Sequence, residues 1–349
     1  MTTQAHNNLK EYYGKVLNHS NDLKTNACCC DADSIPAEVR EALKLIHHEI
    51  TDRFYGCGSP IPPLLEGKTV LDLGCGTGRD AYILSRLVGA SGHVIGVDMT
   101  DEQLETARKH ISYHTEKFGY AKANIEFRQG FIEDLAAIGI ADNSVDIVVS
   151  NCVINLSPDK ESVFREIFRV LKPGGELYVS DIFADRRIPE ALRNDPVLHG
   201  ECLSGAMYTE DFRRLLARLG CQDYRQTSEA VVTIDNAEIE ARIGFACFSS
   251  VTVRAFKLAG LEDICEDYGQ TAVYDGGIAG HPHHFDLDDH HRFFTGKPML
   301  VCGNTAAMLQ ESRFGAHFTV SGDRSTHFGA FDCKPAVAKT EPAAGGACC

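Results

Sequence analysis

The stretch that decides the fold is Val70-Leu71-Asp72-Leu73-Gly74-Cys75-Gly76-Thr77-Gly78. Its apolar first half predicts a buried strand, and its glycines predict a sharp turn in which the backbone can approach a ligand closely. A helix is expected to begin near Arg79. A nicotinamide-binding loop would carry its third glycine at position 79, whereas here it is Gly78. Taken alone, the loop is weak evidence, because many strand–helix turns are rich in glycine.

Short apolar runs alternate with amphipathic helices after this loop. The predicted strands are residues 70–73, 94–97, 125–128, 145–149 and 176–180. One helix is expected to start at Thr100, with Gln103 completing a capping box, and another to run from Ser157 to the turn at residues 172–175. This alternation predicts an α/β fold with a parallel sheet.

Composition shifts divide the chain into four parts. Residues 1–66 are expected to be a helical segment, with one helix near residues 9–17 and a second that starts at Pro36. The face of that second helix is drawn from the apolar series Val39, Leu43, Ile46, Ile50 and Phe54. Residues 67–225 form the α/β domain, 226–320 a smaller α+β domain with a helix near 237–248, and 321–349 a flexible tail.

Charge and composition argue against a nucleic-acid-binding, membrane-spanning or secreted protein. The chain has 349 residues and a formal net charge of −15, which disfavours a nucleic-acid partner. It has no apolar run of the ~20 residues that a membrane span needs, and its first residues lack a signal-peptide core. We therefore expect a cytoplasmic protein; separately, we expect a monomer. Fourteen cysteines in a reducing compartment indicate thiol or soft-ligand chemistry rather than structural disulfides.

A donor site is predicted around the glycine loop. Asp98 ends the second strand, where a carboxylate can accept both hydrogen bonds of a ribose diol, and Met99 is expected to lie against an adenine. The loop at residues 130–134 follows the third strand, and in the class I methyltransferase folds that the glycine loop resembles this loop brackets the adenine from its other face. The glycine spacing, with an acid two residues ahead, resembles motif I of class I S-adenosylmethionine methyltransferases. The predicted cofactor-binding residues are Asp72, Gly74, Cys75, Gly76, Gly78, Arg79, Asp98, Met99, Ile132, Glu133 and Asn151, with the Cys75 thiol as mere filler.

An acceptor site is predicted beside it. Cys152 follows the fourth strand, and ligands of open α/β sheets bind outside the carboxyl ends of strands. A thiolate selects thiophilic ions. Cys57 lies in a constrained glycine turn, and Cys202 lies just before a helix that Thr209 opens. Each of the three is more often a packed core cysteine than a ligand, and no close-spaced zinc pattern occurs, so the residues alone leave this question open.

The chain resembles the arsenite S-adenosylmethionine methyltransferases along nearly its whole length. The matching stretches are residues 12–17, 22–28, 53–58, 72–78, 150–156, 200–206, 274–278 and 303–309. The resemblance implies a Rossmann-like class I methyltransferase sheet followed by a smaller α+β domain. It also implies that four cysteines carry the chemistry, namely Cys28, Cys57, Cys152 and Cys202, of which the last three would bind trivalent arsenic.

Two other cysteine groups complicate that assignment. Cys29 and Cys30 stand directly beside Cys28 and depart from the family's usual pattern, which blurs which of the three thiols acts. Family members often end in paired cysteines, and Cys348-Cys349 fits that habit.

The implied activity is methyl transfer from S-adenosylmethionine to arsenite and methylated arsenicals, delivered as glutathione or other thiol conjugates, in arsenic detoxification. Pairing two cysteines as a disulfide can supply the two electrons that return arsenic to the trivalent state, and glutathione or thioredoxin would reset the enzyme. The alternatives are a methyltransferase for a small quinone-like or sterol-like acceptor, and a metalloid-binding thiol protein without turnover. Asp72 and Asp98 argue against the second, because a pure binder has no use for a donor site.

Two further groups of residues have simpler interpretations. The histidines and acids between His281 and His291 are expected to form a solvated loop rather than a metal site. The remaining cysteines are expected to be core or surface thiols: Cys221, Cys247, Cys265, Cys302 and Cys333.

Overall fold

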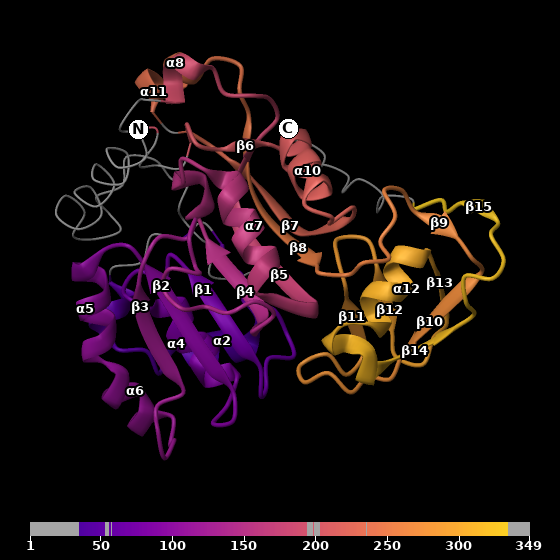
Figure 1. The fold of residues 1–349 in the computed structure, drawn as a ribbon, viewed down its shortest axis with the longest axis horizontal. Helices are drawn as coiled ribbons and strands as arrows, with labels where there is room; N and C mark the ends of the chain where they lie inside the picture. The colour runs from indigo at the N-terminus through magenta and orange to yellow at the C-terminus, as the bar shows by residue number, and fades with distance from the viewer. Residues whose placement is uncertain are drawn as a thin grey trace, which may run out of the picture.

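A computed structural model describes residues 35–52, 56, 58–193, 198, 203–234 and 236–333. The chain folds around one large sheet with the strand order β3-β2-β1-β4-β5-β8-β7 (Figure 1). The parallel strands are β1 (Thr69–Leu73), β2 (His93–Asp98), β3 (Ile125–Gln129), β4 (Val145–Asn151) and β5 (Leu171–Ala184). The short β6 (Met207–Tyr208) pairs with β5, whereas β8 (Phe248–Phe256) and β7 (Tyr224–Val232) extend the sheet antiparallel. The predicted α/β class is confirmed, and the sheet is mixed.

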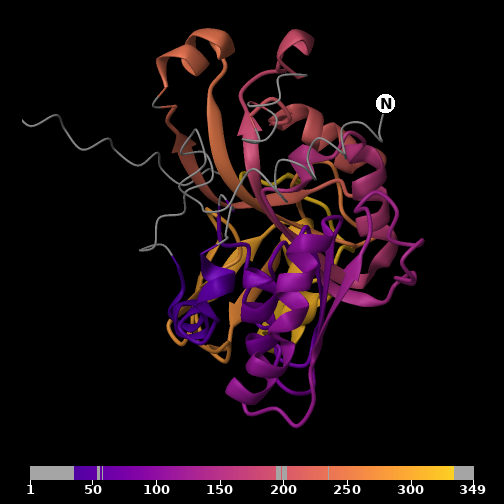
Figure 2. The ribbon, with the colours of Figure 1, turned by 90° about the vertical axis from the view of Figure 1, so that its left-hand side faces the viewer.

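Helices cover both faces of this sheet (Figure 2). On one side lie α2 (Ala37–Leu43), α3 (His48–Thr51), α4 (Arg79–Leu87), α5 (Asp101–Lys109) and α6 (Ile111–Lys117). The other side carries η4 (Ile154–Leu156), α7 (Lys160–Val170) and α10 (Thr209–Arg218). Two short helices, α8 (Glu190–Arg193) and α11 (Ala237–Ile243), lie beyond the strand ends.

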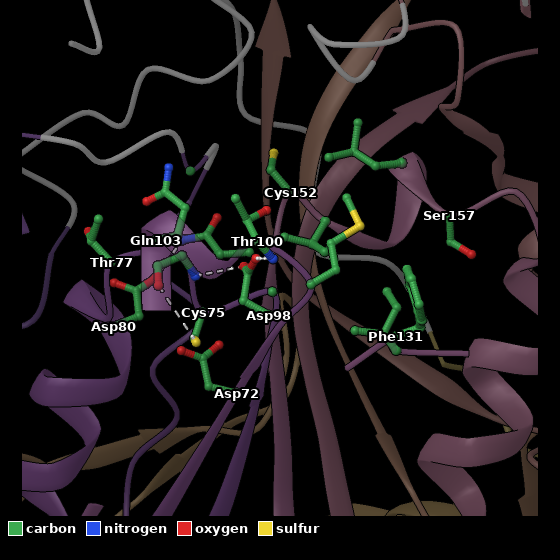
Figure 3. Close-up of a pocket in the computed structure, with 18 of the residues that line it drawn as sticks. Asp72, Cys75, Thr77, Asp80, Asp98, Thr100, Gln103, Phe131, Cys152 and Ser157 are labelled. Atoms are coloured by element: carbon green, nitrogen blue, oxygen red, sulfur yellow. Dashed lines mark hydrogen bonds between the residues drawn. The ribbon is translucent and has the colours of Figure 1, made fainter. Parts of the chain in front are cut away.

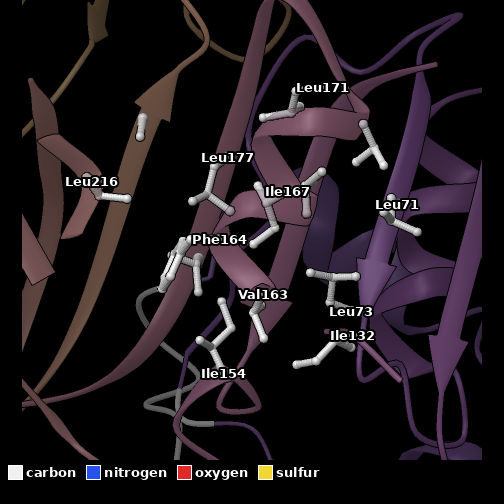
Figure 4. Close-up of a cluster of buried hydrophobic side chains, with 14 of the residues drawn as sticks. Leu71, Leu73, Ile132, Ile154, Val163, Phe164, Ile167, Leu171, Leu177 and Leu216 are labelled. Atoms are coloured by element: carbon white, nitrogen blue, oxygen red, sulfur yellow. The ribbon is translucent and has the colours of Figure 1, made fainter. Parts of the chain in front are cut away.

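Successive side chains of each strand point to opposite faces of the large sheet, so the hydrophobic core has one part on each face. Leu71 and Leu73 of β1 pack with α7 and α10 residues such as Phe164 and Leu216 (Figure 4). Val70, their neighbour, packs in a second cluster with α2, α4 and α5. Successive side chains of a strand point to opposite faces, so a continuous apolar run is what a sheet covered on both sides requires.

A smaller unit follows β8. Its three-stranded sheet has the order β13-β10-β14, and two two-stranded ladders pair β11 with β12 and β15 with β9. The elements are β9 (Glu266–Asp267), β10 (Gln270–Tyr274), β11 (His284–Asp286), β12 (Arg292–Phe294), β13 (Met299–Val301), α12 (Gly303–Gln310), η5 (Arg313–His317), β14 (Phe318–Ser321) and β15 (Gly329–Ala330). Its core combines aliphatic with aromatic side chains, the latter including Tyr274, Phe285, Phe293, Phe314 and Phe318.

Buried ion pairs join the unit to the sheet. Glu176 of β5 is fully buried and contacts Arg254 of β8 at 2.7 Å and Arg313 of η5. Arg313 also donates to the Pro63 carbonyl at 3.0 Å. A buried carboxylate needs such partners, because the loss of one leaves a charge without compensation.

The second helix of the N-terminal segment differs from the prediction. The chain forms α2 and then α3, separated by residues 44–47, instead of one helix through Phe54. His47 has an extended ψ of 136° and caps α3 by accepting from the Glu49 amide. The predicted apolar face still packs as one cluster, with Val39, Ile46 and Ile50 buried. The predicted helix near residues 9–17 and Phe54 lie outside the described residues.

Two predicted helix ends and one predicted capping box are also wrong, although α5 begins at the predicted N-cap, Thr100. Thr100 makes no side-chain capping bond, and its amide instead donates to the Asp98 carboxylate at 2.8 Å. The helix expected to reach residues 172–175 ends at Val170, since β5 starts at Leu171. The helix near residues 237–248 ends at Ile243, because Gly244 has a φ of 70° and Phe248 opens β8.

Two of the predicted domain boundaries fall within paired β-structure. β7 spans the predicted 225/226 boundary, and the large sheet continues to Phe256. The predicted tail from 321 onward contains β15, whose Ala330 pairs with Glu266 of β9. Backbone pairing therefore orders the chain to residue 333, and residues 334–349 lie outside the described part.

Candidate active site

One pocket opens at the carboxyl ends of β1, β2 and β4 (Figure 3). The glycine loop between β1 and α4 forms its floor, and Gly74 in that loop has a φ of 69°. A Cβ atom on Gly74 would lie 2.4 Å from the Val153 side chain, so this backbone approach requires glycine.

Asp98 fixes the shape of the glycine loop. Its Oδ2 accepts from the Gly76 amide at 2.9 Å, and its Oδ1 accepts from the Thr100 amide at 2.8 Å. Burial raises the pKa of Asp98, although these backbone hydrogen bonds oppose the shift. Each carboxylate oxygen has a second lone pair, so the residue can still accept hydrogen bonds from a ligand.

The deep end of the pocket is acidic. Asp72 and Asp80 line it together with Asp98, and Arg79 donates to Asp80 at 3.0 Å. Burial, followed by the charges of Asp80 and Asp98, raises the pKa of Asp72 well above its usual value. The buried Oδ2 of Asp72 accepts no hydrogen bond from the described residues. Such an atom is costly to bury alone, and a cationic ligand with N–H donors would satisfy it.

The loop after β3 forms another wall. Phe131, Ile132 and Glu133 line the pocket there, and Met99 lies on the wall that β2 supplies. Glu133 accepts from the Ser157 hydroxyl at 2.5 Å, which ties this loop to the segment before α7.

Cys152 lies at the opposite end of the pocket from Asp72 (Figure 3). It follows β4 directly, is buried, and has a φ of 56°, which is rare for a residue with a side chain. Its amide donates to the Ser180 carbonyl of β5 at 2.9 Å. Its sulfur belongs to a disulfide bond in this structure, whereas the six other described cysteines are free.

Asn151, the residue before Cys152, connects three segments. Its Nδ2 donates to Asp80 at 2.8 Å and to the Gly58 carbonyl at 2.9 Å, and its Oδ1 accepts from the Gly58 amide at 3.3 Å. Gly58 is packed so tightly that a Cβ atom there would lie 2.0 Å from the Ser180 hydroxyl. Gly56 lines the pocket. The two glycines of the predicted Cys57 turn are thus placed at the carboxyl end of β4.

The segment from Leu203 to Ala206 packs near Cys152 and Asn155. Leu203 and Ala206 share a buried apolar cluster with Cys152 and Leu156. The Asn155 amide group donates to Asp181 at 2.7 Å and to the Ile182 carbonyl at 2.6 Å. A network anchored in β5 therefore supports the turn that follows Cys152.

The structure gathers most of the predicted site residues. All the predicted cofactor-binding residues line the pocket except Gly78, which caps α4 with a φ of 91° and packs near Phe127. The Cys75 thiol is buried beside Gly96, and burial raises its pKa well above the usual value, which agrees with a filling role. Cys28, Cys29, Cys30, Cys57, Cys202, Cys348 and Cys349 lie outside the described residues.

Sequence reasoning missed several lining residues: Thr77, Asp80, Thr100, Gln103, Val153, Leu156 and Ser157. Asp80 had a readable signal, since it is an acid in the first turn of the helix that follows the glycine loop. Gln103 reaches the pocket because α5 starts directly after Asp98. No pattern in the sequence indicates that Ser157 would reach the loop after β3.

Two expectations about other groups need correction. Asp288 and His291 are buried rather than solvated, because they form a network with Arg225, whose Nη1 lies 3.1 Å from the Asp288 carboxylate. Cys221 is a core thiol and Cys247 an exposed one, as expected. The sulfurs of Cys265, Cys302 and Cys333, in contrast, lie within 4.8 Å of one another. Among the described helices, none is both long and apolar enough to cross a bilayer.

Comparison with known proteins supplies the family. Residues 64–220 match the model of a methyltransferase domain, and residues 268–345 match the arsenite methyltransferase C-terminal domain. The chain is 55% identical to an arsenite methyltransferase of Aquipseudomonas alcaligenes over 94% of each chain. It is 45% identical to the human arsenite methyltransferase over 89% of this chain and 82% of that protein.

A solved structure agrees with this assignment. The crystal structure of an arsenic(III) S-adenosylmethionine methyltransferase from Chlamydomonas reinhardtii superposes with a TM-score of 0.83 at 53% identity. The match covers 86% of this chain and all of that one. By contrast, a demethylmenaquinone methyltransferase of Lactococcus lactis matches only 32% of this chain. The chain belongs to the arsenite methyltransferase family.

Proposed function

We propose that this enzyme transfers the methyl group of S-adenosylmethionine to trivalent arsenic held by protein sulfur, with Cys152 as the sulfur next to the donor. The observation that carries the proposal is that Cys152, a soft ligand, lies in the wall of the same pocket as Asp72 and Asp98. Soft thiolates select thiophilic elements over hard cations. One pocket thus combines a site for a cationic cofactor with a site for arsenic.

The residues of the pocket fit S-adenosylmethionine. Asp98 would accept from the ribose hydroxyls, and the Oδ2 of Asp72, which has no described donor, would accept from the ammonium group. Met99 and Ile132 would flank the adenine. When bound, the cofactor supplies an electrophilic methyl carbon, which the arsenic lone pair attacks as the carbon–sulfur bond breaks. Asp72, Asp80 and Asp98 favour the positive charge of this ligand over a neutral one.

Cys57 and Cys202 are proposed as the further arsenic ligands. Support comes from their neighbours, since Gly56 lines the pocket, Gly58 is bonded to Asn151, and Leu203 packs in the cluster of Cys152. Trivalent arsenic forms three bonds, so inorganic arsenite can use three sulfurs and its monomethyl form two. The enzyme's contribution is to hold the reactants in line and to exclude water, with Val153 and Leu156 as apolar walls.

Each methyl transfer raises arsenic to the pentavalent state, so a two-electron reduction must follow. Two nearby thiols give up their protons and two electrons and become a disulfide, while arsenic returns to the trivalent state. The disulfide of Cys152 in this structure supports its role as one of the pair. Glutathione or a thioredoxin then reduces the disulfide by thiol exchange. Arsenic is delivered as a glutathione or other thiol conjugate.

The test is incubation of the enzyme with methyl-labelled S-adenosylmethionine, arsenite and a thiol reductant, followed by chromatography of the products. We expect labelled methylarsenicals from the wild type and none from Cys152→Ser, because a hydroxyl is a harder and far less acidic ligand than a thiol. Cys221→Ser is the matched control, since it removes another buried thiol outside the pocket. Wild-type activity in Cys152→Ser would refute the assignment of the arsenic site.

A further inference from the structure

Three cysteines of the smaller unit form a cluster that the proposed reaction does not use. The sulfurs of Cys265, Cys302 and Cys333 all lie within 4.8 Å of one another. Cys265 directly precedes β9, Cys302 caps the N-terminus of α12, and Cys333 follows β15. These elements lie on the side of the molecule opposite α5 (Figure 1), and none of their residues lines the donor pocket.

Backbone pairing brings two of the three residues together. Ala330 of β15 pairs with Glu266 of β9, and the Phe331 amide donates to the Cys265 carbonyl at 2.8 Å. The Cys333 amide then donates to the Phe331 carbonyl at 2.9 Å, a tight turn that follows the ladder. The cluster is therefore built by regular secondary structure and not by chance contact of loops.

Cys302 is surrounded by donors. Its fully buried sulfur accepts from the Thr305 amide at 3.4 Å and from Arg225 at 3.8 Å, and it lies 3.2 Å from the Thr305 hydroxyl. Arg225 is itself fixed by Asp223 and Asp288. A guanidinium and a helix N-terminus both stabilise a thiolate over a thiol. This environment suits a sulfur that acts as a ligand better than one that only fills space.

The number and chemistry of the three sulfurs indicate which ion this cluster would bind. Zinc in a structural site takes four protein ligands, and in the described part of the chain no imidazole or carboxylate completes this group of three. Trivalent arsenic forms three bonds in a pyramid and keeps a lone pair, so three sulfurs saturate it. We propose that Cys265, Cys302 and Cys333 form a second site for trivalent arsenic, which holds the metalloid as a tris-thiolate and does not methylate it.

The binding step balances without a co-reactant. Arsenous acid exchanges three arsenic–oxygen bonds for three arsenic–sulfur bonds, and its oxygens leave as three waters. The protons come from the thiols, with one from solvent where Cys302 is already a thiolate. No electrons move. Cys265 and Cys333 are half-buried, so the metalloid can enter from solvent and link β9, α12 and β15.

The experiment counts bound arsenic in the reduced full-length protein without methyl donor. Equilibrium dialysis against arsenite, followed by elemental analysis, gives equivalents of arsenic per chain. The triple variant Cys265→Ser/Cys302→Ser/Cys333→Ser should lose one equivalent relative to the wild type. The control Cys221→Ser/Cys247→Ser removes a buried and an exposed thiol outside the cluster and should lose none. Methylation is then measured on the same protein preparations after methyl donor and reductant have been added. Its rate should stay within twofold of wild type in both variants.

Folding and competing ligands are controlled separately. Because Cys302 caps α12, a single Cys333→Ser variant with a wild-type unfolding midpoint should still lose the same equivalent. Equal binding by the wild type and the triple variant would overturn the inference, as would tight zinc binding that arsenite fails to displace. Loss of the equivalent in an enzyme that does not methylate arsenite would refute the proposed function alone and leave this site standing.

Discussion

Asn151 holds the backbone of Gly58 through both ends of its side-chain amide, accepting from the Gly58 amide at 3.3 Å and donating to its carbonyl at 2.9 Å. The same Nδ2 donates to Asp80 at the start of α4. One polar side chain therefore joins the segment before β1, the glycine-loop helix and the end of β4. Gly56 and Asn151 line the pocket, so these hydrogen bonds hold that part of the pocket wall in place.

Asn151→Ala should reduce arsenite methylation by at least tenfold. It removes three hydrogen bonds, each worth about 1 kcal/mol, two of them to the Gly58 backbone and one to Asp80. Asn124→Ala is the matched control, because Asn124 is also buried and bonds to Ser85 and Gly89 far from the pocket. Steady-state kinetics and urea unfolding separate the effects. Equal activity of both variants would mean that Asn151 only stabilises the fold.

Asp98→Ala should weaken S-adenosylmethionine binding by about 1.5–3 kcal/mol for each charge-assisted hydrogen bond lost. The structure adds a second cause, since the Gly76 and Thr100 amides lose their acceptor. Asp146→Ala, at the other end of β4, removes an acid that accepts from the Thr69 amide and should leave donor affinity unchanged. Calorimetric titration measures both. An unaltered affinity in Asp98→Ala would exclude it as the ribose acceptor.

The N-terminal thiols should matter for one substrate only. We expect the variant Cys28→Ser/Cys29→Ser/Cys30→Ser to impair methylation of inorganic arsenite, which can use a third sulfur, and to spare methylation of methylarsonous acid. Cys202→Ser should abolish both reactions, as should Cys57→Ser if disulfide reduction is obligatory. Product speciation with each substrate decides the matter. Full activity of the triple variant on arsenite would remove these thiols from the mechanism.

Acid should destabilise the contact between α3 and α6. His114 accepts from the His47 amide at 3.3 Å through Nε2, and its Nδ1 lies 2.8 Å from the His110 carbonyl, an arrangement that requires a neutral ring. Burial lowers the pKa of His114 to about 4. A folded-state pKa below the unfolded value means that this stability is complete above about pH 6.5 and is lost as the pH falls towards 4.

The loss from His114 should be at most about 3 kcal/mol. Urea unfolding at pH 7.5, 6 and 5 would show it as a falling free energy of unfolding. His114→Gln, which keeps a neutral polar side chain, should flatten this dependence, whereas His327→Gln at an exposed position should not. An unchanged slope in His114→Gln would contradict the assignment.

Two truncated chains, ending at Cys333 and at Val320, test which C-terminal residues the fold needs. Cutting after Cys333 should leave methylation under excess reductant largely intact. Cutting after Val320 removes the end of β14 and all of β15, so β9 loses its partner strand and the unfolding midpoint should fall. Thermal unfolding and turnover of both truncated proteins provide the check. A stable enzyme ending at Val320 would show that the β9–β15 ladder contributes little.

The sequence predicted the parts of the fold that depend on local pattern. The five parallel strands and the glycine loop follow from apolar runs and turn residues, which act over a few positions. The break between α2 and α3 could not be predicted, because it depends on His47 adopting an extended backbone while the apolar series continues past it. The antiparallel β8 depends on pairing with β5, which no local pattern in either strand indicates.

The site residues that the sequence predicted also depend on local pattern, and those that it missed depend on contacts between distant elements. Asp98 and Cys152 were predicted because they follow strands directly, at the edge where ligands of such sheets bind. The cluster of Cys265, Cys302 and Cys333 was missed, because only the pairing of β9 with β15 and the start of α12 bring these distant residues together. Spacing along a chain predicts neighbours within one element and fails between elements.

The buried Glu176 has a consequence for synthesis on the ribosome. Arg313, one of its two cationic partners, follows 137 residues later in the chain. A nascent chain that ends before Arg313 would have to bury this carboxylate with Arg254 alone or leave this part of β5 hydrated. We therefore expect the methyltransferase half to reach its final packing only after the C-terminal half has been translated. The two parts match separate family models, yet neither is expected to serve as an independent module in domain-swapping or fusion experiments.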